Sequence, residues 1–140
     1  MNKWMKSLGI IKKIFLYGIL TAILIMAATY LGLKIWIRHD ANVIADRTVE
    51  IFHKDRVASL LLCLDSDSFL IREKNDAIWA LGAFKDKRAL GKLESLVTHE
   101  KCSYGHLCQY EIQKAILKIK RDYKALWKLD PRKYHTIRKG

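Results

Sequence analysis

The sequence lacks the residue patterns on which most catalytic sites depend. It contains no phosphate-binding loop, and although His106 lies close to Cys108, no acid that would orient the histidine is evident. Asp65 and Asp67 suggest calcium binding, but the remaining oxygen ligands and the closing glutamate of such a loop are missing. A helix-capping role explains these aspartates better. We therefore expect neither enzyme activity nor a cofactor.

Acidic residues are scarce at both ends of the chain. The protein has 26 Lys/Arg and 14 Asp/Glu, a formal net charge of +12. Residues 1–38 carry six basic and no acidic residues, residues 39–117 carry eleven and twelve, and residues 118–140 carry nine and two. Because the middle of the chain is near neutral, we expect no nucleic-acid groove there. Basic ends suit an anionic lipid surface or an acidic partner.

Charged residues are absent between Ile14 and Leu33. At about 1.5 Å per residue, a helix over this run spans roughly 30 Å, the thickness of the hydrocarbon core of a bilayer. Aromatic residues that favour the headgroup region lie near its two ends, at Tyr17, Tyr30 and Trp36. A buried core helix is the alternative, but every side of the segment is apolar. The sequence predicts a single transmembrane helix over residues 14–37.

The basic segment that precedes this helix, residues 1–13, raises the question of a cleaved signal peptide. The apolar run is longer than the roughly 7–15 residues of a secretory signal, so we expect an uncleaved signal anchor. Four lysines precede the span, whereas Lys34, Arg38 and Arg47 follow it. The positive-inside rule then predicts a cytoplasmic N-terminus and an extracytoplasmic domain, which would be periplasmic in a bacterium.

Helical periodicity continues after the anchor. Asp40 is placed to cap a connecting helix over residues 38–54. A helix whose apolar face includes Cys63 follows, and Asp67 or Ser68 is expected to begin the next one.

Two further helical patterns meet between Asn75 and Val97, on either side of Lys85-Asp86. Asp86 is placed to accept the free N–H groups of the second helix. The apolar positions are Ala77, Ile78, Leu81 and Phe84 in the first helix, and Ala89, Leu90, Leu93, Leu96 and Val97 in the second. Both helices are too short to be stable alone, so each must pack against neighbours.

This region resembles a HEAT-like repeat of the phycobilisome-lyase type. The matching features are Arg72, the DAIWALGAF run at 76–84 and the DKRAL run at 86–90, with a degenerate second copy at Gln109–Lys118. The resemblance implies an all-α, α-solenoid domain over residues 55–128 that serves as a binding surface. It also implies a structural role for Arg72 in packing between repeats.

The segment at residues 98–108 departs from a plain repeat. In an oxidising compartment, Cys102 and Cys108 would form a disulfide across a short loop. In a reducing compartment, His99, Cys102, His106 and Cys108 could bind zinc, although their spacing matches no standard zinc motif. Free thiols are the third alternative. Similar membrane-anchored HEAT-like proteins carry a comparable cysteine pair, and this resemblance favours the disulfide.

Two tryptophans and the basic tail are the candidate contact residues. Trp79 and Trp127 are candidates for a partner surface, although core packing is the simpler role for Trp79. Asp130-Pro131 should end the last helix, and a tail at residues 129–140 follows. Its candidate contacts to an anionic surface are Arg132, Lys133, Arg138 and Lys139.

These observations favour a membrane-anchored, non-catalytic module that binds another protein, or an accessory subunit of a membrane complex. A lyase-like enzyme is an alternative that follows only from the resemblance. A basic helical repeat that binds nucleic acid or anionic lipid is another, and it requires a continuous Lys/Arg stripe on one face.

Overall fold

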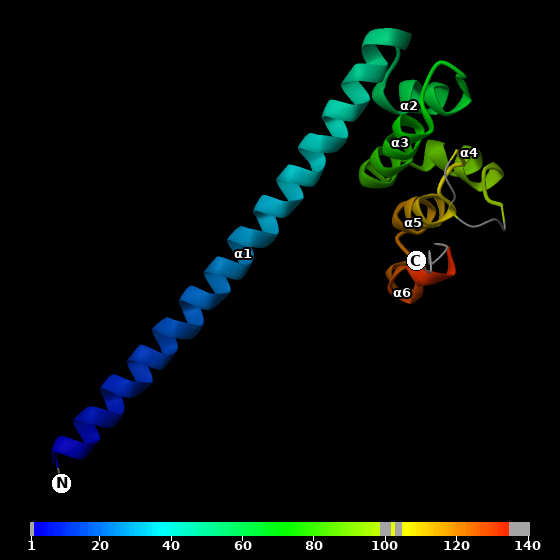
Figure 1. Ribbon diagram of the computed structural model, residues 1–140. Helices are drawn as coiled ribbons and strands as arrows, with labels where there is room; N and C mark the ends of the chain where they lie inside the picture. The colour runs from blue at the N-terminus through cyan, green and yellow to red at the C-terminus, as the bar shows by residue number, and fades with distance from the viewer. Residues whose placement is uncertain (1, 99–101, 103–104, 135–140) are drawn as a thin grey trace, which may run out of the picture. The chain divides into compact units, whose positions relative to one another are not determined.

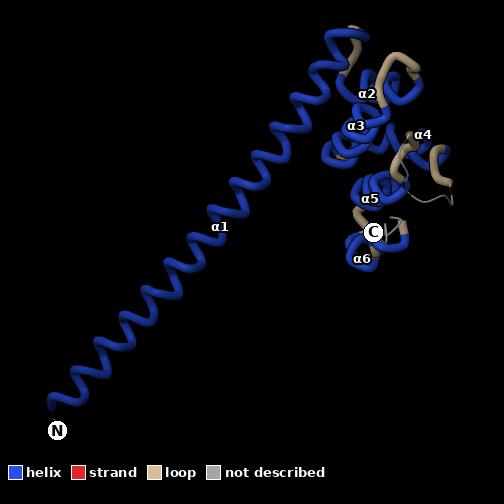
Figure 2. The backbone as a smooth tube through the Cα atoms, viewed as in Figure 1, coloured by secondary structure: helices blue, strands red, loops and turns tan. Residues whose placement is uncertain are grey.

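The computed structural model describes residues 2–98, 102 and 105–134, and within them the protein is helical (Figures 1 and 2). The elements are α1 (Asn2–Phe52), α2 (Arg56–Asp65), α3 (Ile71–Phe84), the 3₁₀ helix η1 (Lys87–Ala89), α4 (Leu90–Ser95), α5 (Gln109–Lys120), α6 (Tyr123–Lys128) and the 3₁₀ helix η2 (Pro131–Lys133). No strand occurs among the described residues. The predicted all-α class is confirmed.

The chain forms two compact units, residues 1–36 and residues 37–140. In the first unit, all side chains from Phe15 to Trp36 are exposed. The helical stretch Phe15–Phe52 contains an 18-residue window of mean hydropathy 1.9, and none of this window is buried. The chain thus has one helix near its N-terminus that is long and apolar enough to span a membrane, as the sequence predicts.

Helix α1 runs without interruption from Asn2 to Phe52. The prediction of a separate helix that begins at Asp40 is therefore wrong. The physical reason is that neither glycine nor proline occurs between Lys34 and Phe52, so nothing ends the helix before His53. Asp40 lies inside α1, where the backbone N–H groups that a cap would bind are already paired.

The second unit buries one apolar stripe from each of several helices. The fully buried residues include Ala41 and Ala45 of α1, Leu60 and Cys63 of α2, Ile78 and Leu81 of α3, Leu93 of α4, and Ile112 of α5. Cys63 occupies the buried position that the sequence predicts. Trp79 is partly buried and packs against this core, which confirms core packing as its role.

Three helices of this unit end in the same way. Their last turns are followed by a residue in the left-handed conformation, namely His53 (φ 53°), Lys85 (φ 56°) and Arg121 (φ 58°). Shortly after each, an aspartate accepts a backbone N–H of the next helix: Asp55 from Val57 at 3.1 Å, Asp86 from Arg88 at 2.9 Å, and Asp122 from Ala125 at 2.9 Å. The predicted capping role of Asp86 is confirmed. The left-handed residue ends one helix, and the aspartate starts the next.

Helices α3 and α5 lie side by side and run in the same direction (Figure 1). Asn75 near the start of α3 contacts Cys108 at the start of α5, and Gly82 near the end of α3 faces Ala115. A Cβ atom at Gly82 would lie 3.0 Å from both Cα and Cβ of Ala115. The absence of a side chain at Gly82 therefore permits the close approach of the two helices.

The start of α3 differs from the prediction. The helix begins at Ile71, not at Asp67 or Ser68, because Glu73 supplies the capping group. Its carboxylate Oε2 accepts the backbone N–H of Leu70 at 2.8 Å, and Asp67 and Ser68 lie in a turn between α2 and α3. The side chain of Arg72 is exposed, and it forms no ion pair with the residues that the structure describes.

Candidate interaction surfaces

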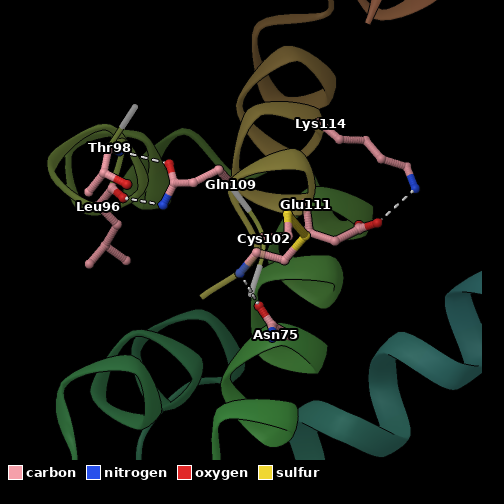
Figure 3. Close-up of a disulfide and its surroundings, with 8 residues drawn as sticks. Asn75, Leu96, Thr98, Cys102, Gln109, Glu111 and Lys114 are labelled. Carbon is pink, nitrogen blue, oxygen red and sulfur yellow. Dashed lines mark hydrogen bonds and ion pairs between the residues drawn. A yellow bond between two sulfur atoms is a disulfide. The ribbon is translucent and has the colours of Figure 1, made fainter. Parts of the chain in front are cut away.

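Cys102 and Cys108 form a disulfide with a Cα–Cα distance of 4.5 Å (Figure 3). The disulfide predicted from the sequence is therefore present. Because the bond engages both sulfurs, neither is available as a thiolate ligand for the alternative zinc site. His99, a further member of that ligand set, lies outside the described residues. Within the described residues, no group of three or more His, Cys, Asp or Glu could hold a metal ion.

Hydrogen bonds fix the second half of the disulfide loop to its neighbours. The backbone N–H of Cys108 donates to Oδ1 of Asn75 on α3 at 2.9 Å. The amide of Gln109, which is buried, accepts from the Thr98 N–H at 2.7 Å and donates to the Leu96 carbonyl at 3.1 Å (Figure 3). One side chain thus joins the end of the α4 segment to the start of α5. The loop is a structural element, held at a polar residue inside the core.

The sequence interpretation missed Asn75 and Gln109. Gln109 gave a usable signal, because it lies three residues before Ile112 on the stripe that Ile116 and Ile119 continue. A polar residue at a buried stripe position needs hydrogen-bond partners, so a bond to a nearby backbone was foreseeable. Asn75 gave no such signal, since its partner lies 33 residues away.

The same loop contacts the C-terminal segment. The Cys102 N–H donates to the carbonyl of Tyr134 at 2.6 Å, and the Tyr134 ring lies 6.0 Å from that of Tyr110. Lys114 lies over the Tyr110 ring at 5.3 Å and pairs with Glu111 at 3.4 Å. The hydrogen bond and the ring contact thereby connect the loop and α5 to Tyr134, which directly follows η2.

Helix α6 presents a face of two aromatic and two basic residues, here called the α6 face: Tyr123, Lys124, Trp127 and Lys128. Their spacing of three and four residues places them on one side of the helix. The Trp127 side chain is 89% exposed and that of Tyr123 is 49% exposed. Lys85 packs over the Tyr123 ring at 5.5 Å, and its ammonium group lies 3.1 Å from the phenol oxygen. Trp127 therefore projects from the domain as an exposed ring, unlike Trp79.

The predicted basic tail is only partly described. Arg132 pairs with Asp130, Nε to Oδ1 at 3.1 Å, and Lys133 is exposed. Hydrogen bonds from the side chain and backbone N–H of Arg132 lower the pKa of Asp130. Arg138 and Lys139 lie outside the described residues. Proline at position 131 starts η2, and α6 ends before it at Lys128, as the sequence predicts.

Charged residues join the turns between the first helices. Arg88 bonds Asp86 at 2.9 Å and Asp55 at 3.2 Å, so one guanidinium contacts the caps of both α2 and η1. Hydrogen bonds from the backbone N–H of Ala58 and from Arg88 lower the pKa of Asp55, and the Arg88 hydrogen bonds lower that of Asp86. These contacts are exposed, and they stabilise the turns rather than form a binding site.

A small hollow of about 60 Å³ lies in the second unit, lined by Ile44, Arg47, Thr48, Cys63, Phe69, Glu73 and Asp76. Its volume is well below the roughly 300–1,000 Å³ of pockets that hold small-molecule ligands. Burial raises the pKa of the Cys63 thiol to about 11, so this cysteine is protonated at neutral pH. The hollow is therefore a poor site for nucleophilic chemistry.

Comparisons of the chain with protein families, with curated proteins and with solved structures found no match.

Proposed function

We propose that this protein is a membrane-tethered, non-catalytic interaction module that holds a short stack of HEAT-like helical hairpins close to a bilayer. The observation that carries the proposal is the continuity of α1. Its residues from Phe15 to Leu33 are uncharged and exposed, and the same helix continues into Ala41, Ala45 and Thr48, which are buried in the domain core. Because α1 belongs to both parts without a break, the anchor raises the local concentration of the domain at the membrane.

The hairpin organisation supports the HEAT-like part of the proposal. α1 and α2, α3 and η1, and α5 and α6 each follow one another in the chain across a left-handed residue and a capping aspartate, and α5 and α6 also pack together. These left-handed residues are 32 and 36 residues apart. The parallel contact between α3 and α5 is the arrangement expected when equivalent helices of neighbouring repeats stack.

The disulfide supports an extracytoplasmic domain. Disulfides persist in the periplasm, the ER lumen and outside the cell, and are rare in the cytosol. Together with the lysines before the apolar run, the Cys102–Cys108 bond favours a cytoplasmic N-terminus. Thiol labelling of intact cells, with and without reductant, tests this orientation. Free Cys102 and Cys108 thiols that react only from the cytoplasmic side would overturn it.

Two exposed apolar residues, Ile51 at the end of α1 and Leu70 just before α3, fit a protein partner. Ile51 is 58% exposed and Leu70 is 71% exposed, and their chain neighbours Phe52 and Phe69 stack with ring centres 5.9 Å apart. A rigid aromatic pair with exposed aliphatic residues beside it can supply the central contact of an interface. We assign the partner surface to Ile51 and Leu70.

Affinity purification of the full chain in mild detergent, at endogenous expression, tests this assignment. A partner protein should co-purify, and Ile51→Ser with Leu70→Ser should reduce its recovery about tenfold or more. Val43→Ser is the matched control, because Val43 is an exposed apolar residue of α1 (40%) outside the patch. A chain that purifies alone would contradict the proposed function, and equal losses in the patch and control variants would contradict the assigned surface.

A further inference from the structure

The α6 face combines an exposed aromatic ring with unpaired positive charges. Lys124 and Lys128 lie three residues before and one residue after Trp127 and are exposed. Neither has an acidic partner within the described part of the chain, whereas the nearby Lys120 pairs with Glu94 at 2.6 Å and Arg132 pairs with Asp130. The two lysines are therefore free to meet an external anion.

This combination fits a bilayer surface better than a protein. In protein interfaces, an aromatic hot spot is surrounded by packed neutral contacts, and lysine is depleted. Trp127 instead lies in the chain between Lys124 and Lys128, on the same exposed helix, and is 89% exposed. At a bilayer surface, tryptophan partitions into the headgroup region and neighbouring lysines bind anionic lipid, so the same residues are favourable together.

We propose that the α6 face docks on an anionic bilayer surface, with Trp127 inserted among the headgroups and with Lys124 and Lys128 on lipid phosphates. This inference rests on the proposed tethering, since the anchor supplies the high local lipid concentration that makes a small contact effective. The uneven charge of the chain agrees with it, because residues 118–140 carry nine basic and two acidic residues.

The test uses the full chain in nanodiscs of phosphatidylcholine alone or with an equal part of phosphatidylglycerol. Trp4→Phe and Trp36→Phe leave emission from Trp79 and Trp127, and the further variant Trp127→Phe gives the Trp79 background. Lipids brominated near the top of the acyl chain quench tryptophans at the headgroup level. We expect loss of most Trp127 emission in the anionic discs, and recovery at about 1 M salt, where the Debye length falls to about 3 Å.

Substitution of the two lysines sharpens the test. Each lysine near an anionic surface contributes roughly fivefold, so Lys124→Gln with Lys128→Gln should lower the ratio of docked to undocked chains roughly thirtyfold. Lys54→Gln with Lys87→Gln removes the same charge from exposed positions outside α6 and should leave the quenching unchanged. Equal quenching in neutral and anionic discs, or an equal effect of the two lysine pairs, would overturn the proposal.

Quenching of Trp36 reports membrane insertion of α1 and so separates the test of the anchor from the test of the α6 face. In a chain that retains Trp36 as its membrane reporter, quenching of Trp36 without quenching of Trp127 would overturn the docking and leave the anchor in place. Absence of Trp36 quenching, with the chain released by alkaline extraction, would overturn both. If Trp127 is protected only after a cellular protein binds, the α6 face is a protein interface and the lipid proposal is wrong.

Discussion

Leucine side chains differ in solvent exposure between the two units of this helical protein. Leu24 is 60% exposed in the first unit, whereas Leu60 and Leu81 in the second are fully buried. From Phe15 to Leu33 the helix is apolar on every side, so no single face is available for packing against a domain core. In the second unit the helices are apolar on one stripe only. The difference shows that the distribution of apolar residues around a helix decides which partner covers it.

Helix α1 contains both patterns. From Phe15 to Leu33 it exposes uncharged side chains all around, and from Arg38 onward charged residues are interspersed with the buried Ala41, Ala45 and Thr48. The buried residues are three or four positions apart, which places them on one face. One continuous helix thus changes from a surface suited to lipid to a surface suited to protein.

The largest expected effect comes from placing charges in the apolar run of α1. Leu24→Arg with Ala28→Arg places two charges on one face of the apolar run, at a cost to insertion of about 5–7 kcal/mol. The chain should then move from the membrane fraction to the supernatant on alkaline carbonate extraction. Leu24→Ala with Ala28→Leu is the neutral control and should stay in the membrane. Full retention of the arginine variant would contradict a membrane-spanning role for α1.

Packing in the core of the second unit is tested by truncating one leucine in each unit. Leu81→Ala should lower the free energy of unfolding of the domain by about 2–5 kcal/mol, since the buried side chain leaves a cavity. Leu24→Ala removes the same atoms from an exposed position and should not change the unfolding midpoint. Denaturant unfolding in detergent, followed by Trp79 emission in a chain with the other tryptophans replaced by phenylalanine, measures both. Similar midpoints for the two variants would contradict the buried position of Leu81.

The disulfide has an intermediate effect that is confined to the second unit. Cys102→Ser with Cys108→Ser should destabilise the domain by about 2–3 kcal/mol, because the open loop gains freedom in the unfolded chain. Membrane retention should not change. Reductant should produce the same loss in the unmodified chain and no further loss in the double variant. An unchanged midpoint under reductant would show that Gln109 and Asn75 hold the loop without the covalent bond.

The smallest effect concerns the turn between α3 and η1. Asp86→Ala removes the cap on η1 and should cost about 1 kcal/mol, while Asp86→Asn retains an acceptor and should cost less. The pKa of Asp86 is lower in the folded chain, so its ionised form adds stability above the unfolded-state pKa. This contribution is lost as the pH falls through the folded-state pKa. Urea unfolding at neutral and acidic pH should show the gap between the original chain and the Asn variant closing in acid.

Local patterns predicted several features correctly. The stripe through Ile78 and Leu81, the cap at Asp86 and the buried Cys63 all depend on neighbours within one or two turns. The predicted start of α3 failed because serine and aspartate in the DSDS segment compete with Glu73 for the capping role. Sequence propensity alone does not decide between such competing caps.

The candidate surfaces were only partly predictable. The sequence favoured core packing for Trp79 and left Trp127 as a candidate for a partner surface, but the burial of each depends on whether other helices cover it. Similarly, the bond between Asn75 and Cys108 joins residues on two helices, and no pattern within either helix indicates it.

The sequence by itself determined the apolar run, the uneven charge and the positions of the amphipathic helices, because each follows from residues that are close in the chain. Only the tertiary structure decided that α3 and α5 pack in parallel at Gly82 and Ala115, that Gln109 and Asn75 hold the disulfide loop, and that Trp127 stays exposed. These features depend on which distant segments meet. That choice follows from the packing of the whole domain rather than from the preferences of any one helix.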